Sequence, residues 1–482
     1  MAIPPDALYL DPRGEGTKQA QLRQLVAQAI LAGRFRPGER MPSSRALARH
    51  LGLSRMTVTL AYTELMADDY LRSRGRSGYF VSENAPRPPD HAPTPRRDSV
   101  DWARHLPRRF SGGRALERPA DWARYRYPFI YGQTDATLFD HANWRLCALK
   151  ALGQRDFAAL AADAYDGDDP QLVDFLARHA LPRRGILADP AEILVTLGAQ
   201  NALWLTAQVL LGPGRPAAVE DPGYPALRDI LRALSAETLP APVDDGGLDP
   251  AALPTGAGVV FVTPSHHCPT TVTMPMERRR ALLDRAARDD LLIVEDDYEF
   301  EIPGRGGPLP ALKSLDAEGR VIYVGSFSKS LFPGMRLGYL VGPAPFIAEA
   351  RALRGAVLRH PPGLIQRTVA HFLSLGHYDA LVRRMGRAYG ARRRTMIEAI
   401  ARHDLTLAGP GGQGGSSLWM RLPNGGDARA LAERLRRDSV VIEPGDAFFA
   451  GADPPRGFYR LAYSSISEAA IPEGIARIAA AL

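Results

Sequence analysis

Residues 321–339 read VIYVGSFSKSLFPGMRLGY. The opening VIYVGS is a short apolar run, rich in β-branched residues and ending in small polar ones, which is typical of a buried strand. Four similar runs precede it: AEILVT at 191–196, PAAVE at 216–220, GVVFVT at 258–263 and LLIVED at 291–296. Helical patterns lie between most of these runs. This alternation predicts an α/β body with a mostly parallel sheet.

Ligands of a parallel sheet bind beyond the carboxyl ends of its strands, so the residues that follow each run are the candidate site. They include Gly198, Ala199, Gln200, Tyr224, Asp296, Tyr298, Ser326, Ser328 and Lys329. Lys329 is one of only four lysines among 60 lysines and arginines. Because arginine cannot form a Schiff base, a lysine retained at a strand end indicates amine chemistry.

These residue types match what pyridoxal 5'-phosphate requires. Lys329 offers an amine, Asp296 a carboxylate for the ring nitrogen, and Tyr298 a phenol for the ring oxygen. Tyr224 is placed to cover the ring face. Hydroxyls and an arginine suited to a phosphate dianion are Ser326, Ser328 and Arg336. A helix that opens at Gly198, Ala199 and Gln200 adds free N–H groups for the same phosphate.

The first part of the chain predicts a small helical domain. Residues 18–32 have the apolar spacing of an amphipathic helix, and Ser43 and Ser54 are good caps for two more helices. The segment YLRSRGRSGYFV at 70–81 then has two short β-like runs around a turn rich in Gly and Arg. Three helices and a basic hairpin predict a winged helix-turn-helix within residues 10–82.

The net charge of +7 is concentrated at one end of the chain. Residues 1–84 carry +4 and residues 85–125 another +4, whereas the remainder carries −1. This distribution predicts a polyanion partner, double-stranded DNA, for the N-terminal part. Residues 83–125 begin with ENAPRPPDHAPTPRRD, which has five prolines and no periodicity and predicts a linker. Residues 126–482 then form the ligand-binding body.

The composition excludes several classes of protein. Two cysteines are too few for a disulfide scaffold or a multi-Cys metal cluster, and they favour a reducing compartment. His266 and His267 have no third ligand at a plausible spacing, so no metal site is expected. The start of the chain lacks the pattern of a signal peptide, and no apolar run approaches 18 residues. We therefore expect a cytoplasmic protein without a membrane span.

Several segments carry a resemblance to known families. Within 126–482, VTLGAQNAL, VEDPGYP, EDDY, GSFSKSLFPGMRLGY and YRLAYS resemble, in order, blocks of fold-type I pyridoxal-phosphate aminotransferases. Residues 10–82 resemble the winged-helix domain of GntR regulators through GRFRPGERMPSSRALARHLGLSRMTVTLAYTEL. The combination resembles the MocR subfamily of transcriptional regulators. That resemblance implies a head-to-tail homodimer that senses a small amine or amino acid through pyridoxal phosphate.

Carried over by position, the resemblance implies an internal aldimine at Lys329 and an effector carboxylate bound by Arg460. Two departures stand out. Cys268 and Thr271 replace the Asn and Gly of the family's Asn-Pro-Thr-Gly block, which disfavours efficient transamination but not cofactor binding. Residues 165–172, YDGDDPQL, also lack a glycine of the family's Tyr-Gly-x-x-Gly-type loop.

On the DNA side the resemblance implies contacts from Arg45, Ser54, Arg55, Met56, Thr57, Thr59, Arg74, Gly75 and Arg76. Arginines and hydroxyls mostly hold phosphates, and Arg55 is the best candidate for a guanine edge. Structural interpretations compete with these roles: Asp296 as a turn residue, Tyr224 as a core residue, Arg460 in an ion pair, Arg74 and Arg76 as solvated wing charges. The leading hypothesis is a pyridoxal-phosphate-dependent regulator that senses an amino compound by exchange at Lys329. The alternative is a working aminotransferase with an appended DNA-binding domain.

Overall fold

The chain folds into two compact units, Met1–Pro107 and Arg108–Leu482. The computed structural model describes residues 2–11, 16–86, 99–106, 110, 116, 118–163, 167–301, 309–411 and 414–482, without the side chains of Arg76 and Asn424. Parts of the predicted linker, at 87–98, 107–109, 111–115 and 117, lie outside these described residues, as do 164–166 of the Tyr-Gly-type loop. No helix in the described ranges is long and apolar enough to cross a membrane.

The first unit has the elements of a winged helix-turn-helix, as predicted. Its main elements are α1 (Lys18–Leu31), α2 (Ser44–Leu51), α3 (Arg55–Ala67), β1 (Leu71–Ser73) and β2 (Tyr79–Val81), followed by the short α4 (Trp102–His105). The strands β1 and β2 pair antiparallel. Each of the three main helices begins at a hydroxyl cap, because Thr17, Ser43 and Ser54 accept a hydrogen bond from a backbone N–H three residues later.

The predicted core face of α3 is confirmed. Val58, Ala61, Tyr62 and Leu65 are all fully buried, and the hydroxyl of Tyr62 donates to the carbonyl of Pro42 at 3.0 Å. This hydrogen bond ties α3 to the segment that precedes α2. The opposite face of α3 is left free, and Met56 there is 66% exposed. The helix is therefore anchored by one face and presents the other to solvent.

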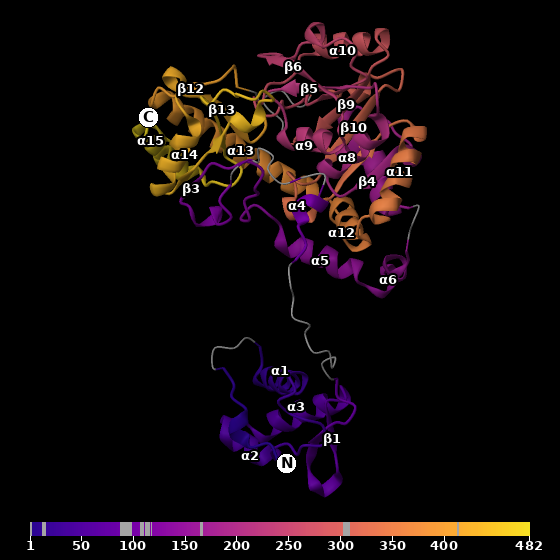
Figure 1. Ribbon diagram of the computed structural model, residues 1–482, viewed down its shortest axis with the longest axis vertical. Coiled ribbons are helices and arrows are strands. Elements are labelled where there is room, and N and C mark those ends of the chain that lie inside the picture. Colours follow the sequence, from indigo (N-terminus) through magenta and orange to yellow (C-terminus); the bar gives the residue numbers. More distant parts are fainter. Residues whose placement is uncertain are drawn as a thin grey trace. The chain divides into compact units, whose positions relative to one another are not determined.

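The second unit is built on one eight-stranded sheet (Figure 1). In spatial order its strands are β4 (Ile193–Thr196), β11 (Gly338–Val341), β10 (Val321–Ser326), β9 (Leu292–Asp297), β8 (Val259–Val262), β5 (Ala217–Asp221), β6 (Thr238–Asp244) and β7 (Gly247–Leu248). From β10 to β6 every pair is parallel, and β11 is antiparallel to both of its neighbours. All five predicted strands therefore run the same way, and their carboxyl ends share one edge.

Helices cover both faces of this sheet. The helices of this part of the chain are α5 (His141–Ala151), α6 (Gln154–Ala161), α7 (Pro170–Phe175), α8 (Ala199–Leu210), α9 (Pro225–Ala233), α10 (Met276–Arg288), α11 (Ala344–Leu358), α12 (Gly363–Ser374) and α13 (His377–Arg402), of which α8, α9 and α11 pack on one face and α10 on the other. Alternate residues of each strand face opposite layers. On β8, Val259 and Phe261 pack with α8, α9 and α11, whereas Val260 and Val262 pack with α10.

A smaller antiparallel sheet lies near the C-terminus, and the sequence patterns did not predict it. Its strands in order are β12 (Thr406–Leu407), β13 (Ser417–Arg421), β16 (Phe458–Ala462) and β15 (Glu443–Pro444). Helices α14 (Ala428–Arg437) and α15 (Ile471–Ala480) accompany it, and β14 (Val440–Val441) pairs with β3 (Tyr127–Pro128). Two of its strands, β12 and β15, have only two residues each, which is too few for a period-two signal.

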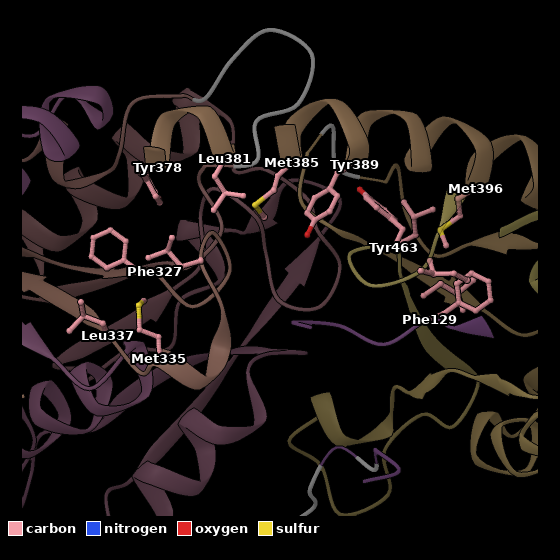
Figure 2. Close-up of a cluster of buried hydrophobic side chains, with 14 of the residues drawn as sticks. Phe129, Phe327, Met335, Leu337, Tyr378, Leu381, Met385, Tyr389, Met396 and Tyr463 are labelled. Atoms are coloured by element: carbon pink, nitrogen blue, oxygen red, sulfur yellow. The ribbon is translucent and has the colours of Figure 1, made fainter. Parts of the chain in front are cut away.

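The long helix α13 connects the two sheets. Figure 2 shows Tyr378, Leu381, Met385, Tyr389 and Met396 pointing from one face of α13 into a single buried cluster. The same cluster includes Phe327, Met335 and Leu337, which flank Lys329, and Tyr463, which follows β16 (Figure 2). Tight packing in this cluster fixes the position of the lysine segment relative to the small sheet. Residues of both sheets can therefore line one cavity.

Candidate functional site

A cavity of about 430 Å³ opens at the carboxyl edge of the large sheet. Ten of the residues predicted for the cofactor and effector line it: Ala199, Gln200, Tyr224, Asp296, Tyr298, Ser326, Ser328, Lys329, Arg336 and Arg460. The eleventh, Gly198, lies directly behind the wall, because a β-carbon there would be 3.2 Å from Nη2 of Arg336. The structure thus gathers in one place the residues that were predicted from separate segments.

Lys329 follows β10 and its amine reaches into the cavity. Its Nζ lies 4.2 Å from the centre of the Tyr131 ring, which is a cation–π distance. Burial lowers the pKa of Lys329 to about 8, and the positive charges of Arg118 and Arg460 act in the same direction against Glu299. An amine with this pKa is neutral in a sizeable fraction of molecules near neutral pH, which suits a nucleophile.

Asp296 is the penultimate residue of β9, and its side chain is almost fully buried. Burial, reinforced by the neighbouring charge of Asp297, raises its pKa to about 7, while Lys329 acts in the opposite direction. Its Oδ1 has no hydrogen-bond partner among the described residues. Asp297 faces the other way and accepts from Nε of Arg184 at 2.8 Å and from the hydroxyl of Tyr323 at 2.9 Å. Asp296 is thus the carboxylate that remains available to a ligand.

The opposite wall has the donors that a phosphate needs. Oγ of Ser328 is buried and has no partner in the described part of the chain. Gly198 takes a positive φ of 80°, and α8 begins after it with no side-chain cap, so the first N–H groups of that helix are open to an anion. Nη2 of Arg336 donates to the carbonyl of Leu197 at 3.3 Å. Backbone and side-chain donors therefore converge at the start of α8.

Three more predicted residues complete the pocket. Tyr224 and Tyr298 both line it, and the Tyr298 hydroxyl donates to the carbonyl of His266 at 2.7 Å. Cys268, which the resemblance to aminotransferases matches to an asparagine of that family, also lines the cavity. Burial raises the pKa of its thiol to about 11, so it is present as a neutral thiol. Thr271 adopts a φ of 64°, the left-handed region in which a glycine would be unstrained.

Arg460 belongs to β16 and faces Glu443 on the neighbouring β15. Its Nε donates to Oε2 of Glu443 at 2.8 Å, and its Cζ lies 4.2 Å from the centre of the Tyr131 ring. Arg118 donates from Nε to the other oxygen, Oε1, at 2.6 Å. Arg460 therefore forms an ion pair with Glu443, which is the structural role given above as the alternative to effector binding. Its side chain also lines the cavity.

Reasoning from strand ends did not find Tyr131, Gly132, Arg118 or Glu443. Tyr131 and Gly132 lie after the two-residue strand β3, and Arg118 falls in the stretch predicted to be a linker. Glu443 is 325 residues from Arg118 in the chain, so no local pattern connects them. The segment YGQTD at 131–135, with a glycine directly after a tyrosine, is a local signal that could have drawn attention to Tyr131 and Gly132.

The predicted DNA-binding residues form an exposed surface on the first unit. Arg45, Arg55 and Met56 are exposed at the starts of α2 and α3. Ser54 and Thr57 are linked by their hydroxyls at 2.8 Å, and Thr59 donates to the carbonyl of Arg55 at 2.9 Å. In the wing, Arg74 lies over the ring of Phe80 at 5.0 Å and Gly75 has a φ of 54°. The side chain of Arg76 lies outside the described residues.

Comparison with known proteins agrees with this division of the chain. Residues 164–478 match the family described as aminotransferase class I and II, and residues 18–81 match bacterial regulatory proteins of the gntR family. The chain is 61% identical to the HTH-type transcriptional regulator TauR of Rhodobacter capsulatus over 100% of both chains. It is 32% identical to the probable rhizopine catabolism regulatory protein MocR of Rhizobium meliloti, over 97% of this chain and 94% of that protein.

Solved structures similar to the second unit are aminotransferases. LysN, the α-aminoadipate aminotransferase of Thermus thermophilus, has a TM-score of 0.71 at 27% identity, covering 80% of this chain and 98% of that one. The kynurenine aminotransferase of Pyrococcus horikoshii has a TM-score of 0.68 at 26% identity, covering 76% of this chain and 94% of that one. The predicted aminotransferase-like fold is confirmed. Among the described residues, no group of three or more His, Cys, Asp or Glu is placed to hold a metal ion.

Proposed function

Since the chain belongs to the MocR subfamily of GntR transcriptional regulators, we propose that it binds pyridoxal 5'-phosphate and a small amino compound in its aminotransferase-like unit. The bound compound would control how the winged helix binds operator DNA. The observation that carries this proposal is the cavity in which Lys329, Asp296, Arg336 and Arg460 meet. The protein would act in the cytoplasm, where operator DNA lies.

The residues present fit the cofactor. Oδ1 of Asp296, buried and unpartnered among the described residues, suits the protonated ring nitrogen. Ser328, also with an unpartnered buried oxygen, would hold the phosphate with Arg336 and the start of α8. Gly132 leaves room at the amine, because a β-carbon there would lie 2.3 Å from Nζ of Lys329. When bound, the cofactor supplies an aldehyde that reacts reversibly with primary amines and a ring that withdraws electrons.

Arg460 and Tyr131 would position the effector. Both the Lys329 amine and the Arg460 guanidinium lie 4.2 Å from the centre of the Tyr131 ring. These two cations are thus separated by at most twice that distance. A short molecule with an amine at one end and an acid group at the other would reach both regions. Arg460 would bind the acid group through its terminal nitrogens, since guanidinium and carboxylate match in a bidentate geometry.

Regulation requires that the effector favour one arrangement of the protein over another. Binding in the cavity would order side chains from both sheets of the second unit. In a homodimer, as fold-type I aminotransferases typically form, such ordering would shift the relative populations of DNA-binding arrangements. This dimer would be head-to-tail, with each winged helix reaching its partner.

The test uses the purified full-length protein loaded with pyridoxal 5'-phosphate. We expect a visible absorbance band that borohydride removes, with the cofactor then fixed to Lys329 in a digest analysed by mass spectrometry. Lys329→Ala should bind the cofactor without this trapping and should lose any amine-dependent change in DNA affinity. A wild-type protein that takes up no cofactor would overturn the proposal. Steady turnover of an amino donor with a keto acid, at typical enzyme rates, would favour the aminotransferase alternative.

A further inference from the structure

Glu443 connects two arginines at the wall of the cavity. Its Oε1 accepts from Nε of Arg118 at 2.6 Å, and its Oε2 accepts from Nε of Arg460 at 2.8 Å. Both arginines line the cavity, whereas the Glu443 side chain is 1% exposed. Neither arginine makes another side-chain hydrogen bond to a described residue. Glu443 therefore occupies the Nε edge of each guanidinium and leaves the Nη groups of both for a ligand.

The three groups together carry a single positive charge. Although burial alone would raise the pKa of Glu443, the charges of Arg460 and Arg118 hold it below its ordinary value, so Glu443 is a carboxylate. Of the two acidic residues that line the cavity, Asp229 is paired with Arg232 at 2.6 Å, and Asp296 belongs to β9. The walls near Arg460 are the aromatic rings of Tyr131 and Phe448. The side chains of Arg460 and Glu443 are only 3% and 1% exposed, so an unbalanced charge beside them is weakly screened.

We propose that Glu443 determines the charge of the effector by cancelling one of the two arginines. A ligand whose tail bears one negative charge brings the Arg118–Glu443–Arg460 group to neutrality. A tail with two negative charges leaves one of them uncompensated in a poorly solvated cavity, which is costly. This inference rests on the proposed function, because it assumes that an amine with an acid group binds near Lys329. It makes Glu443 and Arg118 specificity-determining residues.

The experiment is a cycle of variants that changes the charge of this group in steps. Wild type carries +1, Glu443→Gln carries +2, Arg118→Gln carries zero, and the double variant Glu443→Gln/Arg118→Gln returns to +1. The probes are β-alanine, L-alanine and L-aspartate, because L-aspartate is either of the first two with one carboxylate added. Each is titrated into full-length protein loaded with pyridoxal 5'-phosphate, and the dissociation constant is taken from the absorbance change.

The measured quantity is the ratio of the L-aspartate dissociation constant to that of the tighter monoanionic probe. We expect this ratio to exceed one in wild type, to fall at least tenfold in Glu443→Gln, and to return toward the wild-type value in the double variant. Arg118→Gln should bind both kinds of probe more weakly. A ratio that stays constant through the cycle, or a double variant that behaves like Glu443→Gln, would overturn the proposal.

A matched control separates charge selection from damage to the fold. Asp168 is also a buried carboxylate between two arginines, Arg351 at 3.0 Å and Arg354 at 2.5 Å, but it does not line the cavity. Asp168→Asn should lower the melting temperature without moving the ratio. Borohydride can fix the cofactor to wild-type protein while no probe changes the absorbance spectrum of any variant. In that case the proposed binding of an amine near Lys329 is itself wrong. If the probes bind and only the ratio fails to move, the inference about Glu443 alone is wrong.

Discussion

Gly132 lies so close to Lys329 that a β-carbon on the glycine would come within 2.3 Å of the lysine Nζ. Gly132 also has a φ of 78°, in the left-handed region that other residues avoid. The side chain that is missing at this position is what allows the amine to reach its place above the Tyr131 ring. The position of the Lys329 amine therefore depends partly on a residue almost 200 positions earlier in the chain.

The first prediction concerns this contact. Gly132→Ala should displace the Lys329 amine and reduce trapping of pyridoxal 5'-phosphate by borohydride at least tenfold. The control is Gly376→Ala, since Gly376 has a φ of 76° but open space around its missing β-carbon. Backbone strain of about 1 kcal/mol should destabilise both variants alike in thermal melts. Equal loss of trapping in both variants would show that the contact with Lys329 does not matter.

The second prediction concerns Asp296, whose pKa is raised from 3.8 to about 7 by burial. Without cofactor, the folded protein keeps this carboxyl protonated at a pH where the unfolded chain has already lost the proton. Stability is therefore fully present below the unfolded pKa and is lost as the pH rises through the folded one. Between about pH 5 and about pH 8, cofactor-free wild type should lose about 2 kcal/mol of unfolding free energy relative to Asp296→Asn.

With cofactor bound, wild type rather than Asp296→Asn should be the more stable of these two proteins. Asp296→Asn cannot hold a protonated ring nitrogen, so pyridoxal 5'-phosphate should raise its melting temperature less than that of wild type. Calorimetric melts of both proteins, with and without cofactor across this pH range, check both parts. If cofactor-free Asp296→Asn is no more stable than wild type at the higher pH, the carboxylate is not buried as described.

The third prediction concerns recognition of DNA. Arg55→Ala should weaken binding to a duplex selected from a random pool by about 1–3 kcal/mol and relax the base preference at one position. Arg45→Ala should weaken binding to all DNA sequences alike. It should also reduce the salt dependence of the affinity by about one released ion. Fluorescence anisotropy at several salt concentrations separates the two effects. Arg34→Ala, which removes an exposed charge from the turn after α1, is the control and should change neither.

The fourth prediction concerns assembly. Leu146 and Leu149 on α5, with Phe157 on α6, are each more than half exposed, and such a patch of large apolar side chains is typical of an interface. If this patch lies in the proposed homodimer, Leu146→Glu/Leu149→Glu should yield monomers in sedimentation velocity at micromolar concentration. The control Leu187→Glu changes an even more exposed leucine, which precedes β4 in the chain, and should leave the dimer intact. A double variant that stays dimeric would place the interface elsewhere.

Local patterns predicted much of this protein. The five apolar runs became five parallel strands, and the amphipathic spacing and serine caps became the helices of a winged helix-turn-helix. The rule that ligands bind at strand ends singled out Lys329, Asp296 and Ser328, and all three line one cavity because parallel strands bring their carboxyl ends to one edge. These features depend on residues a few positions apart, which is the range over which a sequence pattern can be interpreted.

The tertiary structure alone decided which distant residues share the cavity. Arg118 came from a stretch that looked like a linker, and Glu443 from a two-residue strand, yet Glu443 binds both Arg118 and Arg460. Their encounter depends on the packing of α13, which holds the small sheet against the lysine segment (Figure 2). Contacts across such sequence distances arise when a core closes, and no local spacing encodes them. The residue types at the strand ends were thus legible in the sequence, whereas the fold alone decided which charges lie together at the wall of the cavity.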